Sequence, residues 1–379
     1  PRMPYASSLS THDDPAIAVA EAIGHILDKL GPSPDFVVVF VSGHFRNRVS
    51  DIHSAVAELL RPNVLIGCTA GAVICGGKEI EDQSGLSIFG GNFDGQVTPL
   101  RIDSPSDLLH DTGQPLADTG VHTMLLLADP FSFPAESALA ECRLLYPKVQ
   151  IIGGLVSATD PSSGDCLFLD GEIYRDGAVA LLIKGEVTIE PLLSQGCRPI
   201  GNPLIITKSR DNMIYELGGQ PALKRLEEMI HALPEKERAL VNHGLHVGRV
   251  IDEHKLEFTR GDFLIRAVIG ADQESGVVAI GDLAPVGSTI QFQVRDASSA
   301  AEDLVQLSSQ IPMADGALLF TCNGRGTNLF ETPNHDASEV STRIRGEAVA
   351  GMFCAGEIGP VSEQSFLHGF TASAAIFRD

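Results

Sequence analysis

Short runs of apolar residues recur along the chain with the length and composition of buried strands. Three of them open a repeated segment: Asp35–Gly43 (DFVVVFVSG), His122–Pro130 (HTMLLLADP) and Gly316–Gly324 (GALLFTCNG). A second run follows each: Asn63–Gly71, Val149–Ser157 and Ala348–Gly356. A third run closes each segment: Gly85–Gly90, Gly177–Ile183 and Thr371–Phe377. The chain therefore contains an internal repeat of three segments.

The gaps between the first and second runs have the periodicity of helices. In the first gap Ile52, Val56 and Leu60 mark one face, and in the second gap Leu139, Cys142 and Leu145 recur between residues 134 and 147. The pattern is weaker in the third gap. A separation of about 30 residues suits two parallel strands joined by a helical crossover. Each segment therefore predicts a β-α-β-loop-β unit.

Two further regions lie outside the repeat. Residues 1–34 predict an N-terminal helix, with Pro15 in its first turn and Gly31-Pro32 at its end. Residues 201–310 contain strand-like runs and one helical stretch, Gln220–Ala232. We therefore expect an α/β (mixed α+β) fold in two lobes, with three copies of the unit and a mixed strand and helix connecting region.

Charge and composition narrow the function. The 379 residues contain 27 Lys and Arg against 49 Asp and Glu, a net charge of −22. This charge disfavours nucleic acid and anionic membrane surfaces as partners. No apolar stretch approaches the ~20 residues of a membrane span. The seven cysteines are scattered without a CxxC spacing, which indicates reduced thiols.

The beginning of the sequence has no apolar signal region, and we expect the natural chain to start at Met3. With reduced thiols and no membrane segment, these features predict a cytoplasmic protein.

The common enzyme templates do not fit this sequence. Ala72–Glu79 (AVICGGKE) lacks the first Gly and the final Ser or Thr of a phosphate-binding loop. Gly324–Gly326 begins a dinucleotide-binding pattern, but Leu329 stands where the third Gly is needed. His243 and His246 have metal-compatible spacing without a third ligand nearby. We therefore assign no catalytic residue, metal site or cofactor.

Four short segments keep a characteristic order: Ile66–Ile74 (IGCTAGAVI), Gly196–Gly201 (GCRPIG), Phe320–Gly326 (FTCNGRG) and Ala355–Pro360 (AGEIGP). Together with the three-fold unit, this order resembles the FIST family, whose chains carry an N-terminal and a C-terminal FIST domain in tandem. The resemblance covers nearly the whole chain. It implies a FIST N-terminal domain at 35–200 and a FIST C-terminal domain at 201–379, the latter made of the connecting region 201–310 and a third unit at 316–379.

The resemblance also implies a function, because FIST domains are regarded as intracellular sensory modules for small ligands, with amino acids the suggested class. We therefore expect a signal-transduction protein that binds an amino-acid-like or other small anionic metabolite in a cleft between the two lobes. No kinase, cyclase or F-box segment accompanies the domains. The signal would then pass by contact with a downstream protein, or by a change in a homo-oligomer.

Small residues at strand ends allow a ligand to approach backbone amides. Arg325 could bind the carboxylate of an amino acid and Glu357 its ammonium group. The alternative is that Arg325 and Glu357 pair with each other. Arg198 could instead hold the crossing between the lobes. The candidate ligand-binding residues are Cys68, Thr69, Gly71, Arg198, Cys322, Asn323, Arg325 and Glu357.

Three other functions stay open. Cys322 or Cys197 could be the nucleophile of an enzyme, because each lies beside an arginine that would lower the pKa of a thiol. The family resemblance also allows a haem-binding gas sensor, with iron ligands drawn from His44, His243, His246 and His368. A protein-interaction scaffold would instead expose an apolar patch.

Overall fold

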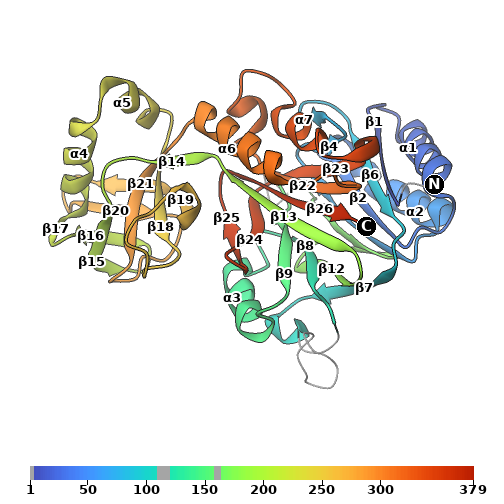
Figure 1. Cartoon of the computed structure of the whole chain (residues 1–379), viewed down its shortest axis with the longest axis horizontal. Helices are drawn as coiled ribbons and strands as arrows, with labels where there is room; N and C mark the ends of the chain where they lie inside the picture. Colours follow the sequence, from blue (N-terminus) through green and yellow to red (C-terminus); the bar gives the residue numbers. More distant parts are fainter. Residues whose placement is uncertain (1–3, 109–119, 158–163) are drawn as a thin grey trace. The chain divides into compact units, whose positions relative to one another are not determined.

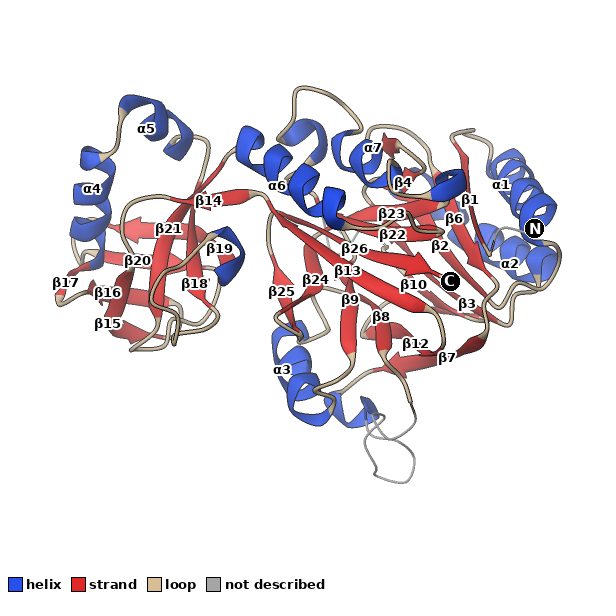
Figure 2. Cartoon of the chain, viewed as in Figure 1, coloured by secondary structure: helices blue, strands red, loops and turns tan. Residues whose placement is uncertain are grey.

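A computed structural model describes residues 4–108, 120–157 and 164–379 of the chain (Figures 1 and 2). The chain divides into two compact units. Unit 1 consists of Pro1–Ser194, Leu304–Leu367 and Thr371–Asp379, and unit 2 consists of Gln195–Asp303 and His368–Phe370. The mixed α+β fold in two lobes confirms the fold class predicted from the sequence. Among the described residues, every helix is too short or too polar to span a membrane.

The three predicted segments are all in unit 1 and share one pattern of strand pairing. In each, two parallel strands are joined by a helix, and a third strand pairs antiparallel with the first. The first segment has β2 (Phe36–Ser42), η1 (Gly43–Arg48), α2 (Val49–Leu60), β3 (Val64–Ala70) and β6 (Leu86–Gly91). The second has β8 (Thr123–Ala128), α3 (Ala135–Leu145), β9 (Gln150–Leu155) and β12 (Ala178–Gly185). The third has β22 (Gly316–Cys322), η6 (Gly326–Asn328), α7 (His335–Ser341), η7 (Arg345–Glu347), β23 (Val349–Cys354) and β26 (Thr371–Arg378).

Each segment also contains a β-hairpin between its second and third long strands. These hairpins are β4–β5 (Val73–Cys75 and Lys78–Ile80), β10–β11 (Leu167–Leu169 and Glu172–Tyr174) and β24–β25 (Gly356–Val361 and Gln364–His368). None stays with its own segment. The first hairpin pairs with β23, the second with β3 and the third with β9. The three segments therefore exchange hairpins in a closed cycle.

This exchange explains why the third segment packs with the first two in unit 1. Each of the three sheets of unit 1 takes strands from two segments, in the orders β1-β6-β2-β3-β10-β11, β25-β24-β9-β8-β12-β7 and β13-β26-β22-β23-β4-β5. The two compact units thus differ from the two domains predicted from the sequence. That prediction grouped the third segment with the connecting region 201–310. The flanking strands are β1 (Tyr5–Ser10), β7 (Gly95–Ile102) and β13 (Thr188–Gln195).

Aromatic side chains pack between strands of two of these sheets. Tyr5 lies 5.8 Å from Phe89 and 5.1 Å from Phe377, measured between ring centroids. Phe36 and Phe377 stack at 6.1 Å. Because these four rings are almost fully buried and come from β1, β2, β6 and β26, they join the first segment to the third through the core.

The predicted N-terminal helix is α1 (Pro15–Leu30). Asp14 caps it, because its carboxylate accepts hydrogen bonds from the amides of Ala16 (2.9 Å) and Ile17 (3.2 Å). The strand β1 ahead of this helix was not predicted. A further helix, α6 (Ala297–Gln310), precedes β22 as α1 precedes β2.

Unit 2 is built around an antiparallel sheet that closes on itself, because β18 pairs with both β19 and β21. Its strands are β14 (Cys197–Pro199), β15 (Leu204–Arg210), β16 (Met213–Leu217), β17 (Gln220–Pro221), β18 (Leu245–Val250), β19 (Phe263–Asp272), β20 (Val277–Ile280) and β21 (Thr289–Arg295). Its helices include α4 (Ala222–Ala232), which lies in the predicted helical stretch, and α5 (Glu235–Val241).

One glycine recurs in the second strand of every segment. A Cβ atom at Gly67 would lie 2.2 Å from the carbonyl oxygen of its register partner in β2. At Gly153 the same distance would be 1.9 Å, and at Gly351 it would be 1.8 Å from the oxygen of Leu319. No real Cβ tolerates such contacts, so the close approach of the parallel strands requires glycine at these positions.

We therefore expect Gly351→Ala to lower the free energy of unfolding by about 2 kcal/mol or more, because the new methyl group must push β23 away from β22. Gly24 in α1 is the matched control, since nothing lies within 4 Å of a Cβ there. Gly24→Ala should raise stability by about 0.5–1 kcal/mol. Urea unfolding followed by circular dichroism measures both. Equal stabilities of the two variants would contradict this account.

Candidate functional site

The residues predicted to bind a ligand lie in three places. Cys322, Asn323 and Arg325 follow or end β22, and Glu357 lies in β24. Cys68, Thr69 and Gly71 lie at the carboxyl end of β3, and Arg198 lies in β14 of unit 2. The first two groups belong to unit 1, so their surroundings can be compared directly.

Arg325 is fully buried, and its guanidinium binds Asp336 at the start of α7. Nε donates to Oδ2 at 2.7 Å and Nη2 donates to Oδ1 at 2.8 Å. Thr321 Oγ1 also donates to Oδ2 at 2.5 Å, and His335 Nδ1 lies 2.9 Å from Oδ1. Burial acts to raise the pKa of Asp336, but Arg325 and these neighbours outweigh it and hold that pKa well below its usual range. The protein itself therefore supplies a bidentate carboxylate partner for Arg325.

Glu357 is also fully buried, but it has no comparable cation bound to it. Its Oε2 atom accepts hydrogen bonds from the amide (3.1 Å) and the hydroxyl (2.9 Å) of Thr371. Among the described residues, no donor in normal hydrogen-bond geometry reaches Oε1. Burial raises the pKa of Glu357 to about 8, although Thr371, Arg325 and the nearby Cys322 thiol act to lower it. At neutral pH this carboxyl is therefore mostly protonated.

A third carboxyl joins this interior cluster from the exchanged hairpin of the first segment. Glu79 in β5 is buried, and its Oε1 accepts the amide of Ala337 at 2.9 Å. Burial and the charge of Asp336 raise the pKa of Glu79 to about 7. The hairpin exchange thus brings residues 79 and 336 together although they are far apart in the sequence.

Cys68 connects the end of β3 to the third segment through sulfur contacts. Its thiol lies 3.1 Å from Met352 Sδ in β23. Burial raises the pKa of Cys68 and of Cys354 well above the ordinary thiol value. Both therefore stay protonated and behave as small core residues, with no character of a nucleophile.

Thr69 and Gly71 lie beside a pocket at the carboxyl ends of β2 and β3. Thr69 Oγ1 donates to Asp165 Oδ1 at 2.9 Å and accepts the amide of Cys166 at 2.9 Å. The amide of Gly71 donates to Ser157 Oγ at 2.5 Å. Thr69 thus fixes the carboxylate of Asp165, and Gly71 forms part of the wall.

This β2–β3 pocket has a volume of about 490 Å³. It is lined by Gly43, His44, Arg46, Asn47, Ala70, Gly71, Ser157 and Asp165. The side chain of Arg46 is exposed and makes no ion pair with any residue that the structure describes. The pocket therefore presents a guanidinium and a carboxylate to the same space, at the edge of parallel strands where small ligands commonly bind.

Arg198 has two carboxylate partners within unit 2. Nε donates to Asp296 Oδ2 at 2.7 Å, and Nη1 donates to Glu237 Oε1 at 2.9 Å. These ion pairs raise the pKa of Arg198 even though burial acts to lower it. The arginine therefore ties β14 to α5 and to the residue that precedes α6.

The histidines suggested as haem ligands and the cysteines suggested as nucleophiles lie in different places in the structure. His44 and His243 are exposed, whereas His246 and His368 are buried in unit 2. Cys197 is 1% exposed and Cys322 is 9% exposed. Across residues 4–108, 120–157 and 164–379, no three His, Cys, Asp or Glu side chains gather as metal ligands.

Four important residues escaped the sequence analysis as site residues: Asp336, Asp165, Glu79 and Arg46. Asp336 opens a short helix in a polar loop, where an acidic residue is common and carries no distinctive signal. Asp165 lies in a loop of the second segment, and only the exchanged hairpin brings it to Thr69. Arg46 could have been found, because it follows the carboxyl end of the first parallel strand.

Comparisons with known proteins cover nearly the whole chain. The model of the FIST N domain matches residues 35–220, and that of the FIST C domain matches residues 222–360. An uncharacterized protein of Mycobacterium bovis is 39% identical over 376 residues, covering 97% of each chain. An uncharacterized protein of Mycobacterium tuberculosis is 37% identical over 388 residues, covering 98% of each. An uncharacterized protein of Methanocaldococcus jannaschii is 22% identical over 212 residues, 51% of this chain and 40% of the relative.

Removing Arg325 should destabilise the fold, because it leaves the buried Asp336 carboxylate without its cation. We expect Arg325→Ala to lower the free energy of unfolding by about 3–5 kcal/mol, and the double variant Arg325→Met/Asp336→Leu to recover much of this loss. Arg345→Ala is the control, because Arg345 makes a similar 2.7 Å pair with Asp315 at a site where the arginine is 53% exposed. It should cost about 1 kcal/mol at most. Equal losses for the two single variants would refute this role.

The raised pKa of Glu357 predicts a dependence of stability on pH. Its folded pKa of about 8 lies above the ordinary value of 4.5, so unfolding releases a proton across this range. The protonated Glu357 carboxyl makes its full contribution to the free energy of unfolding below pH 4.5. This contribution is lost as the pH rises through the folded pKa of about 8. Wild type should lose up to about 1.4 kcal/mol per pH unit relative to Glu357→Gln, measured by urea unfolding from about pH 5 to about pH 8. Exposed Glu331→Gln is the control and should follow wild type; parallel profiles for all three would contradict the assignment.

Proposed function

This chain belongs to the FIST family, and from that premise we propose that it is a sensory protein that binds a small anionic or amino-acid-like ligand in the β2–β3 pocket. FIST domains are associated with sensing in signal transduction. The proposal assigns this sensing to a site in unit 1. The signal would leave by contact with a downstream protein or by a change in the oligomeric state of the chain.

The observation that supports the proposal is the pair of opposite charges on one cavity of suitable size. A volume of about 490 Å³ falls within the ~300–1,000 Å³ usual for small-molecule sites. Arg46 can bind a carboxylate with two parallel hydrogen bonds, and Asp165 can accept hydrogen bonds from an ammonium group. An amino acid carries both groups on one carbon, and a simple anion would use Arg46 alone.

Neighbouring residues would orient these two groups. Thr69 is a positioning residue, because its hydroxyl bonds to Asp165 and restricts the carboxylate. Gly71 lets a ligand approach the end of β3 without meeting a side chain. Six residues that the sequence predicted as ligand-binding are not ligand contacts in this proposal: Cys68, Arg198, Cys322, Asn323, Arg325 and Glu357.

The test begins with a thermal-shift screen of the twenty amino acids and of small mono- and dicarboxylates. The affinity of any compound that raises the melting temperature is then measured by calorimetry. Arg46→Ala should weaken that affinity about 10- to 150-fold, the effect of losing a charge-assisted hydrogen bond. If the ligand is an amino acid, Asp165→Asn should weaken it to a similar degree.

Arg48→Ala is the matched control for Arg46. Arg48 lies two residues away on the same short helix, but it is paired with Asp51 at 2.6 Å and does not line the pocket. Its removal should leave the affinity unchanged. A ligand whose affinity is the same in wild type and Arg46→Ala would refute the β2–β3 pocket as its binding site.

A further inference from the structure

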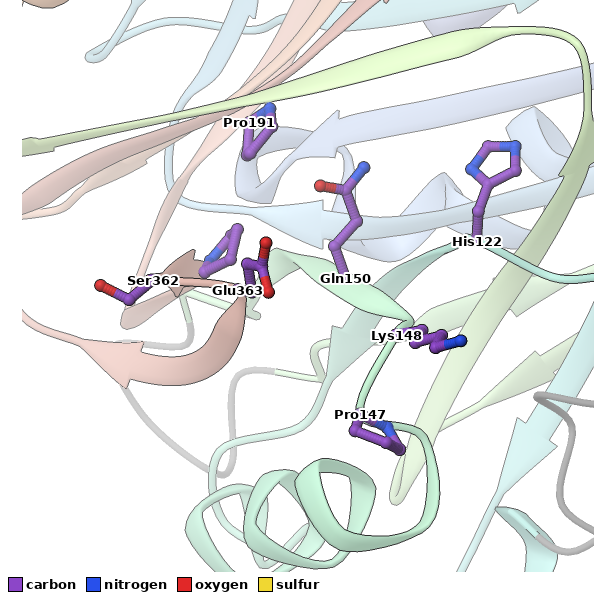
Figure 3. A pocket seen from close by; sticks show the side chains of 8 residues that line it. His122, Pro147, Lys148, Gln150, Pro191, Ser362 and Glu363 are labelled. Carbon is purple, nitrogen blue, oxygen red and sulfur yellow. The ribbon is translucent and has the colours of Figure 1, made fainter.

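Unit 1 has a second pocket, which the proposed sensory site does not use. It has a volume of about 420 Å³ and lies where β8 and β9 begin, since His122 precedes β8 and Gln150 is the first residue of β9 (Figure 3). The β2–β3 pocket lies instead where its two parallel strands end. The two pockets thus lie at opposite ends of equivalent strand pairs and have no residue in common.

The exchanged hairpin β24–β25 forms one side of this second pocket. Its turn residues Ser362 and Glu363 both have positive φ, 48° and 71°. For residues other than glycine, a left-handed backbone conformation costs roughly 1 kcal/mol or more per residue. It persists only where the surrounding structure imposes it. Here the return strand is anchored at Ser365, whose carbonyl accepts Arg143 Nη1 at 2.8 Å and whose hydroxyl accepts the amide of Ile151 at 2.8 Å. The hairpin thus holds Glu363 in a fixed place at the start of β9.

The floor of the pocket is a glutamine with a restrained side chain. Gln150 Nε2 donates to Thr123 Oγ1 at 2.8 Å and to the carbonyl of Ile189 at 2.7 Å. With both amide hydrogens used, the carbonyl oxygen of Gln150 is the hydrogen-bond acceptor that this side chain offers to the pocket. His122 lies beside it, and burial lowers the pKa of this imidazole, which is therefore neutral at pH 7.

Two charged side chains of opposite sign complete the lining. Lys148 and Glu363 are exposed, and neither makes an ion pair with another described residue. In Figure 3, Gln150 lies between Glu363 on one side and Lys148 with His122 on the other. The remaining walls are rigid and apolar, formed by the rings of Pro147, Pro191 and Pro360.

We propose that this pocket is a second binding site, specific for a short peptide with free ends. The amino terminus would bind Glu363 and the carbonyl oxygen of Gln150, and the carboxyl terminus would bind Lys148. The proline rings would pack against the body of the peptide. A free amino acid carries its two charges on one carbon, whereas a peptide of two or three residues separates them, and Lys148 and Glu363 lie on opposite sides of Gln150 (Figure 3).

Calorimetric titration of the full chain with dialanine and trialanine tests this proposal, with alanine, N-acetyl-dialanine and dialanine amide as comparison compounds. We expect saturable binding of the free peptides that is lost when either terminus is blocked. Lys148→Met and Glu363→Gln should each weaken it roughly 10- to 100-fold. The matched control is Glu172→Gln, which removes an exposed carboxylate from the β10–β11 hairpin and should change nothing.

Several results would overturn the proposal: no saturable peptide binding up to about 10 mM, equal binding of blocked and free peptides, or affinity that both pocket variants leave intact. Binding of alanine as tight as that of the peptides would overturn the peptide class. The Arg46→Ala variant keeps this test separate from the proposed sensory site. Peptide binding at the second pocket should survive that substitution, and its loss there would place the peptide in the β2–β3 pocket instead.

Discussion

The structure of unit 1 depends on three β-hairpins that pair outside the segments that encode them. The hairpin of the first segment pairs with a strand of the third segment, and that of the third segment pairs with a strand of the second. The hairpin of the second segment pairs with a strand of the first. Backbone hydrogen bonds must be satisfied in a buried sheet, so each segment needs its neighbour to complete its second strand. The two matched domains, one ending at residue 220 and the other starting at 222, therefore both contribute strands to unit 1.

Within this common framework the loops after the first strands have diverged. The loop after β22 carries a buried arginine that Asp336 neutralises, which closes that edge with a structural ion pair. The loop after β2 carries Arg46 at the surface, where it lines the same pocket as Asp165. A buried ion pair stabilises only as a matched pair, whereas an exposed guanidinium can exchange water for a ligand. The loop after the first strand thus carries a structural ion pair in one segment and an exposed arginine in another.

The sequence predicted the long strands of the three segments and the crossover helices of the first two, because these depend on local apolar runs and periodicity. The helical pattern was weak in the third gap, where α7 is short. The sequence also contained the glycine that each second strand needs, at Gly67, Gly153 and Gly351, although only the structure explains why. The hairpin partners could not be predicted, because a three-residue strand such as β4 has no local feature that specifies β23. For the same reason Asp165 and Glu79 were missed: each reaches its neighbours through an exchanged hairpin.

The cyclic exchange also has a consequence for synthesis of the chain on the ribosome. The β4–β5 hairpin is synthesised long before its partner β23, which belongs to the third segment. Until then β4 and the edge of β9 present unpaired backbone groups, which are the usual starting points for misassociation. Contacts of such long sequence separation also slow folding. The nascent chain must therefore keep these edges protected until the third segment has been made.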